Sequence, residues 1–128
     1  MDNKNNGEKP CEIELSEIGL IDGDVADLLH RANWVYVTEK VPLYEGLIIM
    51  KRVHPDCLKG VHARIIDYIY REGLARVLSE VLGRTVTVNR GTPRPRRGDA
   101  AIIAKTWCVA CDDDIAISDV EFWVAFYW

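Results

Sequence analysis

The stretch LSEVLGRTVTVNRGTPRPRRGDAAIIA, residues 78–104, decides the fold because it joins four patterns without interruption. It opens inside a helical apolar stripe that ends at Gly83, a residue suited to a left-handed helix cap. TVTVN, residues 85–89, alternates polar and apolar residues and predicts a strand. A turn rich in arginine and proline follows. AAIIAKTWCVA, residues 100–110, then has the continuous apolar character of a strand buried on both faces.

Similar patterns lie on both sides of this stretch. WVYVTE (34–39) and GLIIMKRV (46–53) are rich in β-branched and aromatic residues and predict two strands, and CEIELSEIGL (11–20) predicts a short edge strand. Val25, Leu28, Leu29 and Ala32 fall on one face of a predicted helix. VEFWVAFYW (120–128) is apolar on both faces, so we expect an internal layer or a partner subunit to cover this strand.

Residues 61–82 resemble one long amphipathic helix, but the apolar stripe changes phase near Gly73. The second half, residues 74–82, predicts a helix. For residues 61–70 we favour a helix, with a strand followed by a turn as the alternative.

Length and composition indicate a single domain. The chain has 128 residues and 48% apolar content, enough for one core. We expect residues 1–10 to be a disordered tail. We expect residues 11–128 to form one α+β domain, with a mixed sheet of about five to six strands flanked by two or three helices. No apolar run approaches the ~18 residues of a membrane span. We therefore expect a soluble protein of the cytoplasm.

Charge is unevenly distributed along the chain. The net charge of -4 argues against a general nucleic-acid coat, yet five arginines are concentrated within residues 84–97 and five acids within 112–121. Arg90 follows a predicted strand, which suits forked contact with a phosphate, although Asp99 is a possible ion-pair partner. Arg94, Arg96 and Arg97 either form a solvated loop or contact nucleic acid. Arginine outnumbers lysine ten to six, as in proteins from hot environments.

In a reducing compartment we expect the four cysteines to be buried thiols. A metal site is a minor alternative. His54, Cys57, Cys108 and Cys111 would form a Cys₃His zinc set. Its difficulty is that residues i and i+3 of an extended strand lie ~10 Å apart. His30 and His62 lie in predicted helices, and no nucleophile lies at a sequence spacing that would indicate a catalytic pair. We expect the four tryptophans to be core and interface residues.

The stretch of residues 78–104 resembles, without a gap, a family of small proteins from archaeal viruses and bacteriophages. The resemblance lies in the order and spacing of Leu82-Gly83, Asn89-Arg90 and Gly98-Asp99, which precede an apolar strand. Members of this family are ring nucleases and anti-CRISPR proteins of type III systems. WVYVT is similar to the family's opening strand and VEFWVAFYW to its closing strand, so the resemblance covers about residues 34–42 and 71–128. It implies a homodimer with a mixed sheet and flanking helices that binds cyclic tetra-adenylate and needs no metal or other cofactor.

The resemblance implies a ligand pocket that contains Arg90 and, beside it, Asn89. Other family positions differ. Glu39 and Pro42 stand in place of an asparagine and a serine, and Arg71 stands in place of a histidine. Cys108 and Val109 replace a glutamine-arginine pair, and only one of the aspartates at 112–114 can match the family's glutamate.

These differences predict binding with weak or absent cleavage. Attack of a 2′-hydroxyl on the ring needs a proton for the leaving oxygen, which histidine supplies because its pKa is ~6.5, whereas arginine stays protonated to pH ~12. Arg71 can bind a phosphate but cannot act as the acid. We therefore expect a viral nucleotide-binding protein in the host cytoplasm. The alternative is a non-enzymatic module that contacts nucleic acid or a host protein through residues 84–97.

Overall fold

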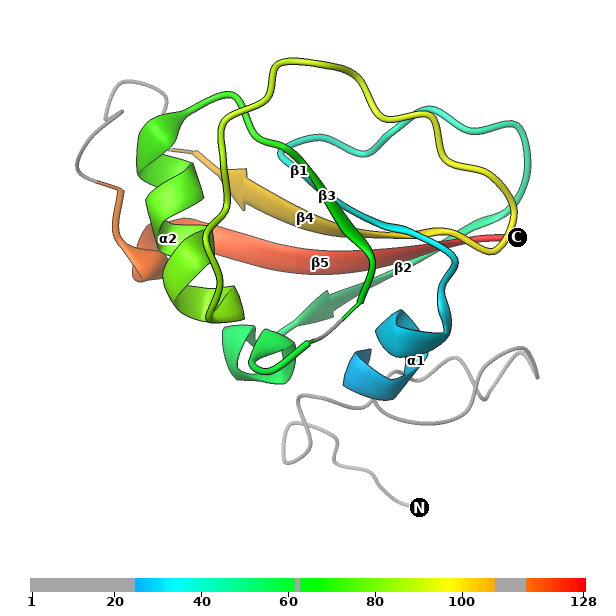
Figure 1. Cartoon of the computed structure of the whole chain (residues 1–128), viewed down its shortest axis with the longest axis horizontal. Coiled ribbons are helices and arrows are strands. Elements are labelled where there is room, and N and C mark those ends of the chain that lie inside the picture. The colour runs from blue at the N-terminus through cyan, green and yellow to red at the C-terminus, as the bar shows by residue number, and fades with distance from the viewer. Residues whose placement is uncertain (1–24, 62, 108–114) are drawn as a thin grey trace.

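The computed structural model describes residues 25–61, 63–107 and 115–128, which form a single α+β domain (Figure 1). The predicted edge strand at 11–20 and the predicted tail at 1–10 lie outside the described residues. The elements in chain order are α1 (Val25–Arg31), β1 (Val35–Thr38), β2 (Ile48–Val53), the 3₁₀ helix η3 (Pro55–Leu58), β3 (Ile65–Tyr68), α2 (Glu72–Leu82), β4 (Ala100–Thr106), the 3₁₀ helix η4 (Ile117–Asp119) and β5 (Val120–Tyr127).

Five strands form one mixed sheet in the order β2-β5-β4-β1-β3. β1 is parallel to both β3 and β4, whereas β5 is antiparallel to β4 and β2. The fold class predicted from the sequence is confirmed. β5 lies between β2 and β4, so both of its edges are paired, and its apolar side chains are buried on both faces of the sheet: Phe122, Val124 and Phe126 on one face, Ala125 and Tyr127 on the other.

The helices pack on one face of the sheet and bury the main core (Figure 1). Successive strand residues point to opposite faces, so Phe122, Val124 and Phe126 of β5 join this core together with Val35 and Ile102 from the neighbouring strands. The α1 and α2 helices add their apolar stripes, Leu28 and Leu29 from the first and Leu74, Val77, Leu78 and Val81 from the second.

The opposite face of the sheet carries a smaller core, and none of the described helices lies over it. Its buried members are Tyr36, Ala101, Ile103, Ala125 and Tyr127, and no residue of α1, α2 or η3 belongs to this cluster. Loop residues Val41 and Tyr44 cover one part of the face. Met50, Ile66 and Trp123 lie on the same face and remain only partly buried. We call these three residues, with the sheet between them, the open face.

Residues 61–70 were predicted as a helix in preference to a strand, and that preference is wrong. Ile65–Tyr68 form β3, an edge strand beside β1. Ile65 packs against the helix-side core while Ile66 lies on the open face, an alternation that a helical stripe conceals. The predicted phase change near Gly73 was real, but the boundary falls just before α2, which already includes Glu72 and Gly73.

Residues 85–89 do not form the predicted strand. They run as an extended segment with one isolated parallel bridge, Val88 to Ile69. The helix before them ends as predicted, because Gly83 takes the left-handed conformation (φ 71°) and donates its N–H to the carbonyl of Ser79. Of the tryptophans, which were expected in the core or in an interface, Trp123 packs against the smaller core, whereas Trp34, Trp107 and Trp128 are exposed. Within the part of the chain that the structure describes, no helix is long and apolar enough to cross a membrane.

Candidate functional site

Residues 90–97, here called the arginine turn, connect the extended segment to β4. Its two prolines, Pro93 and Pro95, are buried, whereas the arginines beside them are exposed. The turn closes through two hydrogen bonds at its base: the N–H of Arg96 donates to the Asp99 carboxylate (2.7 Å), and the N–H of Asp99 donates to the carbonyl of Arg96 (2.9 Å). The buried prolines and this closure hold the backbone of the turn against the domain.

A buried cluster of two tyrosines and one carboxylate lies beneath the turn. The hydroxyl of Tyr36 donates to Asp99 at 3.0 Å, and Asp99 is only 4% exposed. Burial, reinforced by the hydrogen bond to the Asp99 carboxylate, raises the pKa of Tyr36 to about 12. Burial also raises the pKa of Tyr127, whose hydroxyl has no hydrogen-bond partner in the structure. Asp99 therefore anchors the turn through Tyr36 and the Arg96 backbone rather than through the side chain of Arg90.

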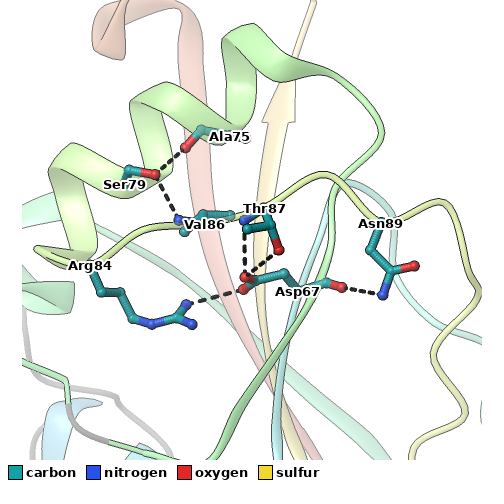
Figure 2. Close-up of polar contacts among 7 residues, drawn as sticks. All are labelled: Asp67, Ala75, Ser79, Arg84, Val86, Thr87 and Asn89. Atoms are coloured by element: carbon teal, nitrogen blue, oxygen red, sulfur yellow. Dashed lines mark hydrogen bonds and ion pairs between the residues drawn. The ribbon is translucent and has the colours of Figure 1, made fainter.

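The extended segment before the turn is held by Asp67 of β3 (Figure 2). One Asp67 carboxylate oxygen accepts from the Arg84 guanidinium (3.1 Å) and the other from the N–H of Thr87 (3.1 Å). The Asp67 carbonyl accepts from the side-chain amide of Asn89 (2.9 Å). These contacts fix the path of the chain up to Arg90, which is the residue that opens the turn.

Two neighbouring hollows lie between the arginine turn and the loop from β1 to β2. The first hollow, about 260 Å³, is formed at the carboxyl ends of β1 and β3. Its lining residues are Thr38, Glu39, Lys40, Val41, Pro42, Leu43, Tyr68, Tyr70, Gly91, Thr92 and Pro93. Gly91 is required here because a Cβ at this position would lie 3.0 Å from the Tyr68 ring.

The second hollow, about 540 Å³, shares Leu43, Thr92 and Pro93 with the first. It is lined in addition by Tyr44, Glu45, Arg94, Pro95 and Arg96. Figure 1 shows the two chain segments that form its walls, the loop after β1 and the yellow stretch that leads into β4, running side by side. Arg97 lies outside both hollows, with its guanidinium 5.4 Å from the ring centroid of Trp128.

The structure places the predicted ligand residues in different environments. Arg90 is exposed and lines neither hollow, although the next residue in the chain, Gly91, lines the first. The amide of Asn89 is occupied, since it donates to Asp67 and accepts from the N–H of Gly91. Arg71 forms an ion pair with Glu39 at 3.1 Å. Contact of Arg90 with a ligand therefore stays a prediction.

Glu39 and its neighbours were not predicted as site residues. The Glu39 carboxylate accepts from the N–H groups of Tyr70 (2.6 Å) and Arg71 (3.1 Å), just before α2, in addition to the Arg71 side chain. Lys40 and Tyr68 line the first hollow. The signal that identifies Tyr68 and Tyr70 is their i, i+2 spacing in IIDYIY, which places both on one side of a strand but on different sides of a helix.

The zinc set predicted as a minor alternative is not supported. Cys57 is buried and disulfide-bonded, so it supplies no thiolate. The Nδ1 atom of His54 accepts a hydrogen bond from the N–H of Asp56 (3.1 Å) and caps η3. Cys108 and Cys111 lie outside the described residues. The favoured state of the cysteines was a free thiol, and for Cys57 that expectation is wrong.

The groups around the hollows suit binding better than proton transfer. Of the described histidines, His30 lies in α1 and His54 precedes η3, and neither lines the first or the second hollow. His62 lies outside the described residues. Cationic side chains and two tyrosine rings can hold a phosphate and a planar base, but arginine and lysine are poor proton donors near neutral pH.

The fold and the hollows together define a class: small single-domain α+β proteins with a five-stranded mixed sheet and helices on one face. A solved structure of similar fold is B116 of Sulfolobus turreted icosahedral virus, with a TM-score of 0.59 at 11% sequence identity. The match covers 74% of this chain and 100% of B116. At this identity the likeness shows a fold shared with a protein of an archaeal virus. No protein-family model matches the sequence, and no curated protein matches it.

Proposed function

We propose that the protein binds an anionic nucleotide of the cyclic oligoadenylate kind in the first hollow, with weak or absent cleavage. The observation that carries this proposal is the composition of that hollow. Lys40 contributes a cation, Tyr68 and Tyr70 contribute aromatic rings, and the exposed Arg90 directly precedes Gly91, which lines the hollow. Phosphates favour such cations, and every nucleotide base has a π-face that stacks on an aromatic ring.

Weak or absent cleavage follows from the partners of Arg71. Arg71 occupies the position where the related family has a histidine, and its guanidinium is paired with Glu39. A paired arginine neither donates a proton nor reaches freely for the scissile phosphate. Loss of one acid-base group typically lowers a rate by ~10² to 10⁴. Sequestration of the nucleotide is then the expected activity.

A second copy of the chain belongs to this proposal. Met50, Ile66 and Trp123 of the open face are only partly buried, and partly exposed apolar faces of this kind favour association with another chain. A homodimer would bring two sites onto one particle. The fold shared with an archaeal-virus protein supports a viral origin, with the host cytoplasm as the place of action and a hot habitat in keeping with the arginine content.

The test is to mix the full chain with cyclic tetra-adenylate and to follow melting temperature and product formation together. We expect the melting temperature to rise by roughly 5–10 °C when the nucleotide is present at about 100 times its Kd, without linear product. Lys40→Ala and Arg90→Ala should each weaken binding about tenfold. Lys59→Ala, a change to a 70% exposed lysine beside η3, serves as the matched control and should bind normally.

Two outcomes count against the proposal in different ways. No change in melting temperature at millimolar nucleotide would remove the nucleotide function. Linear product formed at a rate typical of an enzyme would show that another group supplies the proton. The proposal of nucleotide binding would then stand, and the proposal of weak or absent cleavage would be wrong.

A second candidate function is the contact of nucleic acid or a host protein through the arginine turn. It is favoured by the exposure of the arginines in a turn whose prolines are buried, because side chains on a fixed backbone lose less entropy on binding. Those arginines are Arg94, Arg96 and Arg97. A duplex-DNA titration at two salt concentrations tests the nucleic-acid form, since each neutralised phosphate adds to the salt dependence. Affinity independent of salt would exclude it.

A further inference from the structure

Apolar and cationic side chains meet around the second hollow. Leu43 is 93% exposed on its rim, and Leu47 and Trp128 are about half exposed nearby. These residues are linked: the N–H of Trp128 donates to the carbonyl of Leu47 (2.9 Å), and the Tyr44 hydroxyl donates to the carbonyl of Trp128 (3.2 Å). Exposed apolar residues rimmed by charges are typical of protein interaction sites, and arginine and aromatic residues are enriched there.

The ring of Tyr44 is a fixed part of this surface. It packs edge-on against Tyr127 with ring centroids 5.1 Å apart. A Cβ at Gly46 would lie 2.5 Å from the Tyr44 ring, so the absence of a side chain at Gly46 allows the ring to lie there. The hollow therefore has a rigid aromatic wall, which a ligand can meet with little loss of conformational freedom.

The two arginines of the hollow have a regular spacing. Pro93 and Pro95 are buried, and Arg94 and Arg96 alternate with them and are exposed. In extended chain, residues i and i+2 point to the same side about 6.6 Å apart. A second extended chain that carries acids at i and i+2 has the same repeat, so it can place one carboxylate against each guanidinium.

We propose that the second hollow binds an extended acidic peptide segment of a partner protein, with alternate carboxylates on Arg94 and Arg96 and the intervening aliphatic side chain against Leu43 and Tyr44. A peptide matches the surface better than duplex DNA does, because the exposed leucines and the tyrosine wall contribute nothing to a phosphate backbone. Glu45 lines the same hollow and repels acids near it. The acidic residues of the peptide therefore lie toward the arginine turn, and the end toward Glu45 is neutral or basic.

This inference specifies the site and ligand class of the second candidate function, and it does not depend on nucleotide binding. The experiment titrates the full chain into a fluorescein-labelled peptide that alternates three glutamates with two leucines. One control peptide has the same composition with the three glutamates adjacent, and another replaces glutamate by lysine. The protein variants are Arg94→Ala, Arg96→Ala and Leu43→Ser, with Arg31→Ala as the matched control because Arg31 is an exposed arginine of α1 that lines neither hollow.

Support requires saturable binding of the alternating peptide, weakened about tenfold by each of the three variants and changed less than about twofold by Arg31→Ala. The peptide with adjacent glutamates should bind more weakly than the alternating one. No saturation up to about 1 mM peptide would overturn the proposal, as would equal affinity in all variants. If the same variants instead lose a salt-dependent affinity for duplex DNA while the peptide does not bind, the turn is a nucleic-acid contact. Lys40→Ala separates the two proposals, since it should weaken only nucleotide binding.

Discussion

Two buried tyrosines beneath the arginine turn differ in one respect, the partner of the hydroxyl group. Tyr36 donates to Asp99, whereas the hydroxyl of Tyr127 has no partner. We expect Tyr36→Phe to lower the free energy of unfolding by about 1–2 kcal/mol, because it leaves a buried carboxylate with one hydrogen bond fewer. Tyr127→Phe should leave it unchanged or raise it by about 1 kcal/mol, since it removes an unsatisfied polar atom. Urea denaturation of both variants measures the difference. A larger loss for Tyr127→Phe than for Tyr36→Phe would contradict this assignment.

The same tyrosines make stability depend on alkaline pH. In the folded protein the pKa of Tyr36 is raised to about 12 from its usual value near 10, and the pKa of Tyr127 is raised as well. The unfolded chain therefore releases these protons at lower pH than the folded chain. Their stabilising contribution is complete below pH 10 and is lost as pH rises through about 12, by up to about 1.4 kcal/mol per pH unit for each tyrosine.

Urea midpoints measured from about pH 9 to pH 11.5 test this dependence. The wild-type midpoint should fall across the upper half of the range, and Tyr36→Phe should fall less steeply because one of the two groups is gone. The two proteins differ only at position 36, so the difference between their curves reports the contribution of Tyr36, including its effect on the pKa of Tyr127. Parallel curves for wild type and variant would show that Tyr36 does not contribute.

At the residue scale, the sequence predicted where charged side chains are concentrated better than it predicted which side chains pair with them. The cluster of arginines is visible in the sequence, and Arg90 is exposed directly before Gly91, a residue that lines the first hollow. The pairing of Arg71 with Glu39 is not visible, because the two residues are far apart in the sequence and meet only through the packing of β1 against β3. An arginine that is predicted to bind a ligand becomes a weaker candidate when the fold places a carboxylate beside it as a counter-ion.

Among the elements, the extended segment before the arginine turn depends on a single carboxylate. Asp67 is 8% exposed and binds both the Arg84 side chain and the N–H of Thr87. We expect Asp67→Ala to cost about 2–3 kcal/mol and to speed hydrogen exchange at Thr87 and Asn89. Arg31→Ala removes an exposed i,i+4 pair with Asp27 and should cost less than about 0.5 kcal/mol. Equal costs for the two variants would show that the Asp67 contacts do not hold the segment.

The two wrong predictions at this scale have a common physical cause. Ile65–Tyr68 form a strand and residues 85–89 do not, although the local patterns favoured the reverse. β3 lies beside β1 at the sheet edge, and that position decided the conformation of Ile65–Tyr68. The alternating segment has most of its hydrogen bonds with α2 and Asp67 instead, for example from the N–H of Val86 to the Ser79 hydroxyl (2.8 Å). Only the tertiary arrangement says which partner an extended chain finds.

The fold of the whole molecule was more predictable than its site. Burial patterns predicted a mixed sheet with helices, and the structure has this architecture and shares a fold with a viral protein at 11% identity. Patterns of apolar residues survive extensive substitution because many side chains fill a core equally well. The hollows depend instead on particular loop residues such as Lys40, Leu43 and Gly91, whose proximity has no local signal in the sequence.

The association of two copies is the prediction that involves the whole molecule, because none of the helices in residues 25–61, 63–107 and 115–128 covers the open face of the sheet. Met50 lies on this face in β2 and lines neither hollow. If a second copy covers the face, wild type sediments as a dimer and its melting temperature rises with protein concentration. Met50→Lys should then sediment as a monomer, since it places a charge in the contact. Ile117→Lys changes an exposed apolar residue of η4 and should remain dimeric. A wild type that sediments as a monomer at every concentration would exclude the second copy, and each binding site would then be formed by one chain.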